Sequence, residues 1–307
     1  MGLPVASDFC AEASIQGQEP MLGTASPSTS VWLGVEVRGA WPRNAFDSTT
    51  VPESLRERLA AWASAIPGLR PQALRRPGCD SAGDLAVVLA VTDVGTNRVF
   101  RREAASIESV ADLDLVAAVA VARAGGVPDG WRESETPMIW VCVHGKRDRC
   151  CAKFGVPVYD AAEAAEGIEA WQTSHLGGHR YAATLLCLPY GLCYGRVDAG
   201  DVAPMVRNHG QGRAHDLTLL RGRSCWSAPA QAAIHFVRAH LGEMVLDGFA
   251  PQSESAGEKG TTVRVMSPRG TFDVVVDKRE VGGTAPPSCG KDLEPIRGWF
   301  QVALTPA

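Results

Sequence analysis

One short stretch of the chain concentrates residue types that bind metals. Thiol and imidazole side chains gather between Val141 and the end of the HLGGH motif, at Cys142, Cys150, Cys151, His175 and His179. Cysteine thiolates and histidine imidazoles are ligands for zinc and for iron–sulfur clusters. We therefore interpret the stretch as a metal site, with an iron–sulfur cluster as the first candidate.

The spacing of these ligands reduces the number of metal centres that the stretch could hold. Eight residues separate Cys142 from Cys151, and three separate the two histidines of HLGGH. Zinc and a 2Fe-2S cluster both fit such a set, but structural zinc usually takes its cysteines from a knuckle about two to four residues wide. The wider gap favours iron and sulfur, although spacing alone does not decide between Cys150 and Cys151. HLGGH also lacks the glutamate of an HExxH zinc hydrolase, so a metalloprotease is not expected.

Length and composition exclude several other classes of protein. The 307 residues suffice for two domains, and a formal net charge of -4 offers no broad basic surface for nucleic acid. The N-terminus lacks the basic start and apolar core of a signal peptide, and the longest apolar run, 115–122, is too short to span a bilayer. We therefore expect a soluble cytoplasmic protein without membrane or nucleic-acid partners. Its nine cysteines should stay reduced there, which favours metal or redox chemistry over disulfides.

Residues 1–135 have the pattern of an N-terminal α/β domain, in which strands and helices alternate. Residues 1–30 are rich in Ser, Gly and Pro and are expected to be irregular. Thr50 is expected to cap a helix that ends before Pro67. The remaining apolar patterns predict strands at 31–39, 69–74, 84–92 and 98–101, and an Ala-rich helix at 106–124. No nucleotide-binding glycine motif appears among them.

A polar hinge at 128–137 separates this half from a second expected domain, residues 136–245. The apolar run 138–144 is typical of a buried strand, which puts Cys142 at a strand end. A helix should follow through 165, with Cys150 and Cys151 near its N-terminus, where the helix dipole stabilises a thiolate. The metal ligands would therefore come from a strand end and a helix start.

Residues 246–307 are expected to form a short C-terminal β segment packing on the rest. Ser227 should cap a helix that Gly242 ends, and the Ser, Glu and Gly tract at 253–260 should be a loop. The other elements predicted in this half are a hairpin of 184–188 and 192–197, a helix at 198–208, a hairpin of 261–266 and 271–276, and a strand at 299–304.

The metal-ligand stretch also carries a family resemblance. The run CVHGKRDRCCAKFG, followed by SHLGGHRYAATLLCLPYGLCYGRV, resembles the sucrase/ferredoxin-like family of thioredoxin-fold ferredoxins. Shorter matches extend it to GTA at 23–25, QAAIHFVRAHLG and the terminal SCGK at 288–291. The resemblance implies a thioredoxin-like ferredoxin domain over residues 136–245. The sucrase activity in the family's name is not expected here, because no pair of carboxylates stands out as a glycosidase acid and base.

The resemblance further implies a 2Fe-2S cluster and its ligands. They would be Cys142, Cys151, His175 and His179, with Cys151 preferred over Cys150. Two thiolates and two neutral imidazoles carry less negative charge than four thiolates, so the reduction potential should exceed that of a plant-type ferredoxin. A ligating imidazole keeps a second nitrogen that can exchange a proton. We expect one-electron, proton-coupled electron transfer between redox donor and acceptor proteins that the sequence does not identify.

Two alternatives remain open at this point. In a structural zinc protein, the same four residues would lock the fold and transfer no electrons. A cluster-free thioredoxin-like thiol protein is the second alternative, although a CxxC motif is missing and only the adjacent Cys150 and Cys151 are present. An electron carrier is preferred to a catalyst.

Several residues near the motif have structural as well as functional interpretations. Lys146, Arg147 and Arg149 are candidates for a surface that docks an acidic redox partner. Asp148 is expected to cap the helix, His144 to be structural, and Arg180 to be a candidate contact of the cluster or a partner. Cys10 is interpreted as an unremarkable thiol. Cys187, Cys193 and Cys225 are expected to be core residues. Cys289 belongs to the family motif SCGK, whose role the sequence does not reveal.

Overall fold

The computed structural model describes residues 8–76 and 83–307, and within them it is an α/β protein with six α-helices and fourteen strands. The helices are α1 Cys10–Gln16, α2 Glu53–Ala65, α3 Leu115–Arg123, α4 Arg149–Glu163, α5 Ala199–Gly210 and α6 Ala228–Leu241. The N-terminal segment 1–7, on which part of the signal-peptide argument rests, lies outside the described residues. The predicted α/β class is confirmed.

Ten strands form one continuous mixed sheet, in the order β10-β9-β8-β6-β7-β2-β1-β3-β4-β5. Their bounds are β1 Val31–Glu36, β2 Leu69–Arg75, β3 Leu85–Val91, β4 Arg98–Ala104, β5 Arg132–Glu133, β6 Met138–Cys142, β7 Glu169–Thr173, β8 Leu185–Leu188, β9 Leu192–Tyr194 and β10 Leu220–Arg223. Strands β2 and β7 join the two halves through an antiparallel pairing of Leu74 with Thr173 and of Arg75 with Gln172. The proposed division at residue 135 therefore falls within one sheet and stays a prediction.

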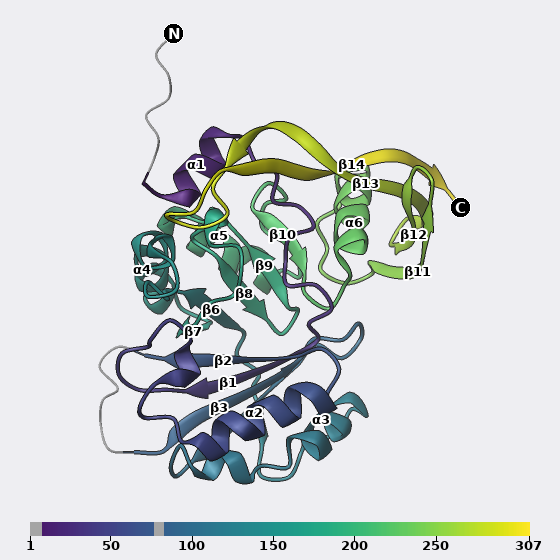
Figure 1. Cartoon of the computed structure of the whole chain (residues 1–307). Coiled ribbons are helices and arrows are strands. Elements are labelled where there is room, and N and C mark those ends of the chain that lie inside the picture. The colour runs from purple at the N-terminus through teal and green to yellow at the C-terminus, as the bar shows by residue number, and fades with distance from the viewer. Residues whose placement is uncertain (1–7, 77–82) are drawn as a thin grey trace.

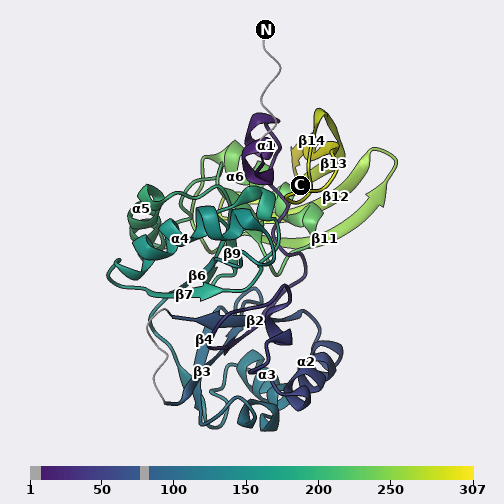
Figure 2. The same ribbon diagram turned by 60° about the vertical axis from the view of Figure 1, so that its left-hand side comes forward.

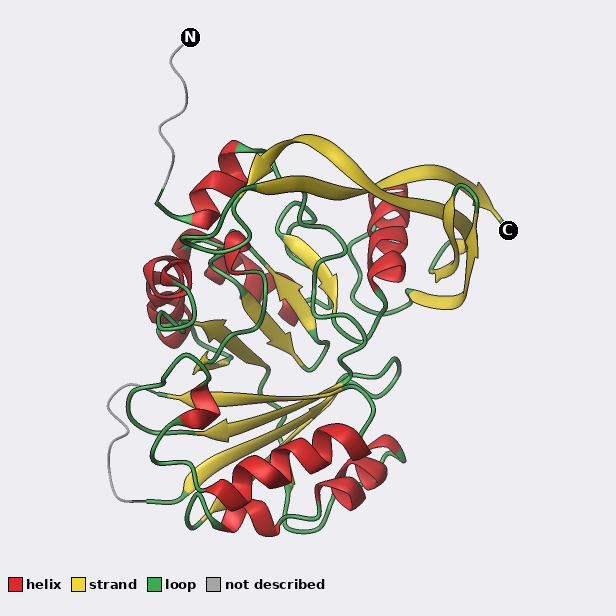
Figure 3. Ribbon diagram, in the orientation of Figure 1, coloured by secondary structure: helices red, strands yellow, loops and turns green. Residues whose placement is uncertain are grey.

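The helices cover different parts of this sheet. Figure 1 shows α2 and α3 side by side on one face of the β1–β4 region, and Figure 3 shows the same two helices in red beneath the yellow strands. Every residue of β1 and β3 is buried, as their continuous apolar runs require. Helix α2 buries Leu55, Leu59 and Trp62 against the sheet. Helix α4 packs against β6 and β7 in the other half.

The C-terminal region forms a second, four-stranded antiparallel sheet in the order β11-β12-β13-β14. Its strands are β11 Ala250–Gly257, β12 Gly260–Ser267, β13 Gly270–Ala285 and β14 Glu294–Pro306. Helix α6 covers this sheet, with Ile234 and Val237 in one apolar cluster with Val263 and Val274. Figures 1 and 2 show the β13–β14 ribbon arching back to α1, so that the loop between these strands reaches the start of α4.

Three predictions about the elements are wrong. The N-terminal segment contains α1, although residues 1–30 were expected to be irregular, because Cys10, Ala11 and Ser14 are buried against distant parts of the chain. The tract 253–260 is mostly strand β11 because its backbone pairs with β12. Helix α2 begins after Pro52 rather than at a Thr50 cap.

The predicted helix at 106–124 is shorter than expected. A 3-10 turn at Ser109–Asp112 precedes it, and Asp114 caps α3 by accepting a hydrogen bond from the backbone of Ala117. Strands β5, β7 and β10 were not predicted; β5 is a two-residue strand within the expected hinge, and β10 contains two arginines. No helix among the described residues has the length and apolar character needed to cross a bilayer.

Candidate metal centre

Two elements bring the first pair of candidate ligands together. Cys142 is the last residue of β6, a strand buried along its whole length. Asp148 is the N-cap of α4, as predicted, and its carboxylate accepts a hydrogen bond from the backbone of Cys150 at 2.9 Å. The helix therefore begins with both Cys150 and Cys151 in its first turn. Cys142 and Cys151 are buried, with 0% and 1% of their surfaces exposed.

The second pair of candidate ligands lies on the loop that follows β7. Gly177 and Gly178 have φ angles of 93° and 72°, which favour glycine and fold the loop back after His175. Arg70 donates to the carbonyl of His175 at 3.0 Å, and Arg221 donates to the carbonyl of Gly177 at 3.0 Å. Two arginines thus fix the backbone between the histidines.

Three candidate ligands converge. The metal-binding atoms of Cys142, Cys151 and His175 all lie within 4.8 Å of one another. The Sγ of Cys151 lies 3.8 Å from Nδ1 of His175, and Nε2 of His175 lies 3.3 Å from Nδ1 of His179. His179 is therefore adjacent to the group through His175. This arrangement can hold a metal ion.

The hydrogen bond of His179 defines which of its nitrogens is available to a metal. Nε2 of His179 lies 2.8 Å from the carbonyl oxygen of Pro287, which can only accept, so Nε2 carries the proton. The neutral ring then has its lone pair on Nδ1, which is the nitrogen that faces His175. A ligating histidine commonly donates its other N–H to a carbonyl or carboxylate in this way. The donor group of Cys142, Cys151 and His175 therefore offers two sulfur atoms and one nitrogen, and Nδ1 of His179 lies next to it.

The protonation of the two buried thiols is unequal. The hydrogen bond from Cys151, followed by that from His175, outweighs burial and lowers the pKa of Cys142 well below its ordinary value. The same hydrogen bond, with burial, raises the pKa of Cys151. Burial also lowers the pKa of His179. One thiolate and neutral imidazole are the forms that bind metal, and a bound metal displaces the second thiol proton.

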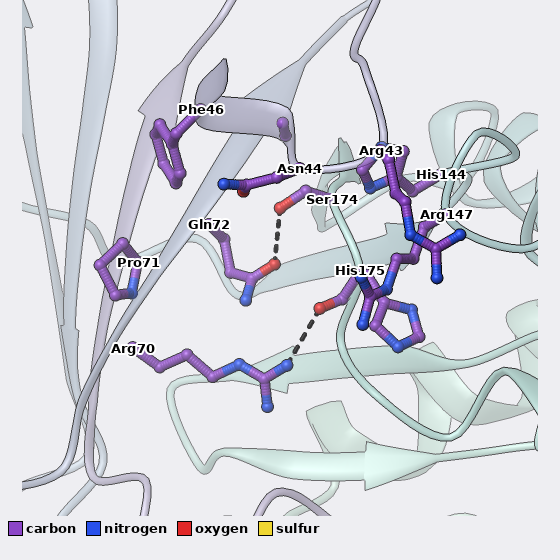
Figure 4. A pocket seen from close by; sticks show the side chains of 11 residues that line it. Arg43, Asn44, Phe46, Arg70, Pro71, Gln72, His144, Arg147, Ser174 and His175 are labelled. Carbon is purple, nitrogen blue, oxygen red and sulfur yellow. Dashed lines mark hydrogen bonds between the residues drawn. The ribbon is translucent and has the colours of Figure 1, made fainter. Parts of the chain in front are cut away.

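A solvent-accessible pocket reaches the candidate centre at His175. Its volume is about 300 Å³, and it is lined by Arg43, Asn44, Ala45, Phe46, Arg70, Pro71, Gln72, His144, Arg147, Ser174 and His175. Figure 4 shows Arg43, Arg147 and His175 among the residues that line this pocket, with Arg70 hydrogen-bonded to the backbone of His175. Three arginines therefore line the pocket to which His175 contributes.

The other residues considered from sequence have assignable surroundings. His144 is buried and its Nε2 lies 2.7 Å from the carbonyl of Pro42, which supports the structural interpretation. Arg149 stacks on Phe9 and donates to the carbonyl of Asp8, while Arg180 pairs with Glu19 at 3.2 Å rather than with the candidate ligands. Cys187 and Cys193 are core residues, as predicted, and Cys225 is half-buried.

Sequence reasoning missed a second group of potential ligands. Cys10, Asp148, Cys150 and Cys289 also have their ligand atoms within 4.8 Å of one another. Sequence separations of 139 to 279 residues between the cysteines conceal this group. The only sequence signal was the SCGK motif, which indicated that Cys289 had some role without naming its partners.

Fold and site together define an α/β protein with cysteine and histidine side chains arranged to bind metal. Residues 21–222 match the sucrase/ferredoxin-like family, and the chain belongs to that family. No curated protein sequence and no solved structure matches the chain. The matched segment contains Cys142, Cys151, His175 and His179, whereas Cys10 and Cys289 lie outside it.

Proposed function

We propose that this protein is a one-electron carrier that binds a 2Fe-2S cluster through Cys142, Cys151, His175 and His179. The observation that carries the proposal is the convergence of two buried thiols with His175, whose ring lies next to that of His179. Family membership adds support because the family description includes ferredoxin-like proteins. Such a cluster, when bound, accepts and returns one electron.

The charges of the proposed ligands determine how readily the site is reduced. Two imidazoles in place of two thiolates remove two negative charges from the ligand set. Arg70 and Arg221, which are hydrogen-bonded to the histidine loop, add positive charge close by. Both effects favour the reduced form. We therefore expect a potential above the value of about -400 mV typical of plant-type ferredoxins.

Electron transfer should be coupled to a proton held by the histidines. The N–H of His179 at Nε2 donates to the carbonyl of Pro287 and is the proton that the chain can release and recover. Added negative charge on reduction should raise the pKa of a ligating imidazole. The potential should consequently fall as pH rises. A potential that stays constant from about pH 6 to 10 would contradict this part of the proposal.

The pocket at His175 is the proposed place where a redox partner approaches. Arg43, Arg70 and Arg147 line it, so an acidic donor or acceptor protein fits better than a basic one. Lys146 is exposed next to Arg147 and extends the basic surface. The free thiols of the described residues suit a reducing compartment, and we propose the cytoplasm.

The first experiment is a visible spectrum with iron and acid-labile sulfide analysis on protein purified without oxygen. We expect broad visible bands and about two irons and two sulfides per chain. His175→Cys and His179→Cys should keep the iron and shift the bands, whereas Cys225→Ser should leave them unchanged. Colourless protein that holds zinc at these residues would replace the electron carrier with a structural zinc protein, and metal-free protein would leave only thiol chemistry.

A further inference from the structure

Three cysteines from remote parts of the chain meet beside the candidate cluster site. Cys10 belongs to α1, Cys150 to the first turn of α4, and Cys289 to the loop between β13 and β14. Their sulfur atoms are separated by 3.5 Å for Cys10 and Cys150, 3.3 Å for Cys150 and Cys289, and 3.7 Å for Cys10 and Cys289. The three sulfurs therefore form a compact triangle.

The size of this triangle matches one face of a thiolate-bound zinc ion. A zinc–sulfur distance of about 2.3 Å in a tetrahedron puts neighbouring sulfurs about 3.8 Å apart. A disulfide needs about 2.05 Å, and all three separations are far longer. Small movements would bring the sulfurs to the separation that zinc requires.

Backbone N–H groups point at two of the three sulfurs. The backbone N–H of Ala11 points to the sulfur of Cys150 at 3.4 Å, and that of Cys10 points to the sulfur of Cys289 at 3.5 Å. Cys150 also lies in the first turn of α4, on the positive side of the helix dipole. Backbone N–H groups directed at sulfur are the kind of supporting contact that metal-bound thiolates receive.

Asp148 supplies an oxygen at the same place. Its Oδ1 lies 3.1 Å from the sulfur of Cys289 and 3.8 Å from that of Cys10. Its carboxylate is held by the hydroxyl of Ser288 at 2.8 Å and by the backbone N–H groups of Cys150 and Cys289, each at 2.9 Å. Carboxylate oxygens bind zinc at about 2.0 to 2.2 Å, so a fourth ligand is present and already oriented.

We propose that Cys10, Cys150, Cys289 and Asp148 form a second metal site, which binds one zinc ion with three sulfur ligands and one oxygen ligand. Binding releases the protons of the three thiols to solvent, and no electron is transferred. The four residues differ from the proposed electron-transfer ligands, although Oδ2 of Asp148 lies 3.7 Å from Nε2 of His179. Two of its cysteines lie outside the segment that matches the family.

The proposed zinc would fasten α1 and the β13–β14 loop beside the candidate cluster site. It would join α1 and the β13–β14 loop to the start of α4, where Cys151 follows Cys150 directly. That loop also contains Pro287, whose carbonyl accepts the hydrogen bond from His179. Zinc binding would thus hold in place the acceptor that orients a proposed cluster ligand.

The test counts zinc and iron separately in the full chain, purified without oxygen from medium containing zinc. We expect about one zinc per chain, falling at least about tenfold in Cys10→Ser and in Cys289→Ser. Cys225→Ser is the matched control, since it removes a half-buried thiol elsewhere, and it should keep the zinc. Cys142→Ser should also keep the zinc even if it loses iron, so failure of one site is distinguished from failure of the other.

A spectroscopic measurement covers the case in which a variant does not fold. Co²⁺ added to the unaltered chain with its iron site filled, or to the Cys142→Ser variant, should give the charge-transfer and visible bands of tetrahedral thiolate coordination, and zinc should abolish them. The proposal is overturned if the unaltered chain with free thiols binds neither ion. It is equally overturned if zinc is lost with Cys142 but not with Cys10 or Cys289, or if two of the three cysteines form a disulfide without oxygen.

Discussion

The imidazole of His179 is oriented by a single carbonyl oxygen. Because Pro287 accepts from Nε2, Nδ1 is the nitrogen turned toward His175. Burial of the ring lowers its pKa, which keeps it neutral and able to bind metal near neutral pH. The two candidate roles of this residue, ligand and proton carrier, therefore belong to different ring nitrogens.

The first prediction concerns this residue. His179→Cys should lower the reduction potential by on the order of 100 mV or more, because a thiolate adds negative charge to the centre. It should also weaken the pH dependence, which can reach about 59 mV per pH unit for one proton per electron. Potentiometric titration at several pH values measures both. Cys225→Ser is the control, and a variant with an unchanged potential and slope would show that His179 is not a ligand.

A second prediction concerns the effect of substitutions in the loop that carries the histidines. Gly178 has a φ of 72°, and a Cβ built there would lie 2.5 Å from the guanidinium of Arg221. Gly212 has a nearly equal φ of 69°, but an added Cβ there meets nothing within 4 Å. Both substitutions by alanine should cost about 1 to 3 kcal/mol of backbone strain. Only Gly178→Ala should also displace Arg221 and the histidine loop.

The measurements for this pair are urea unfolding and iron content. We expect both variants to lose stability, Gly178→Ala by the larger amount, and we expect a marked loss of iron only in Gly178→Ala. Equal iron contents would mean that Arg221 does not position the histidines.

Helices and strands were predictable from the sequence where the residues that determine them are close together in the chain. Asp148 at the start of α4 and Ser227 at the start of α6 are caps that the sequence displays directly, and both accept the expected backbone hydrogen bonds. Helix α1 was missed because it is seven residues long, without a side-chain cap, and its buried side depends on contacts with Cys150 and its surroundings. Strand β11 was missed because its polar residues become a strand only by pairing with β12.

The two candidate sites also differ in whether their residues are close together in the chain. Cys142, Cys151 and His175 lie within a single motif-bearing segment, at a strand end, a helix start and a nearby loop. The strand end of Cys142 and the helix start of Cys151 were predicted, whereas β7, which leads into the loop of His175, was not. The group of Cys10, Cys150 and Cys289 depends on the path of the β13–β14 ribbon, which sequence periodicity does not reveal.

A third prediction concerns His209 of α5 and the pH dependence of the free energy of unfolding. His209 lies near the end of this helix, where Nε2 lies 2.9 Å from the hydroxyl of Tyr194. Burial lowers the pKa of His209 to about 4. An unfolded histidine titrates near 6.5, so between about pH 6.5 and 4 the unfolded state binds the extra proton and the free energy of unfolding falls as pH falls. Because the side chain is only partly buried, the contribution should not exceed about 3 kcal/mol.

His209→Gln should remove this part of the pH dependence. Urea unfolding at pH 7 and pH 4.5 measures it, and His240→Gln, which alters an exposed histidine, is the control. The parent chain and the control should lose more stability between these two pH values than the His209 variant. An identical loss in all three would contradict the neutral, buried state of His209.

At the scale of the whole molecule, the local charge at the candidate site opposes the net charge. The chain carries a formal charge of -4, yet Arg43, Arg70 and Arg147 line the pocket at His175. Opposite local and net charges allow a protein to direct an anionic partner to one place on its surface. The expected docking surface at Lys146 and Arg147 stays a prediction that a small anionic oxidant can test.

The fourth prediction is that ferricyanide oxidises the reduced protein faster at low ionic strength. Salt at about 0.3 M should slow the reaction because it screens the arginines. Arg147→Glu should reduce the rate several-fold at low salt, whereas Lys259→Glu makes the same charge change in an exposed turn between β11 and β12. Stopped-flow measurement gives the rates. Equal rates in the two variants, or a rate that rises with salt, would exclude electron transfer through the arginine-lined pocket.

The β13–β14 loop contacts the candidate site through Pro287, and this contact can form only late in biosynthesis. Translation completes all four proposed cluster ligands with His179, and Pro287, which accepts from that histidine, follows 108 residues later. Cys289 comes two residues after Pro287. A nascent chain therefore has its proposed ligands before it has the carbonyl that accepts from His179, so that ring lacks this hydrogen bond until the β13–β14 loop has been synthesised.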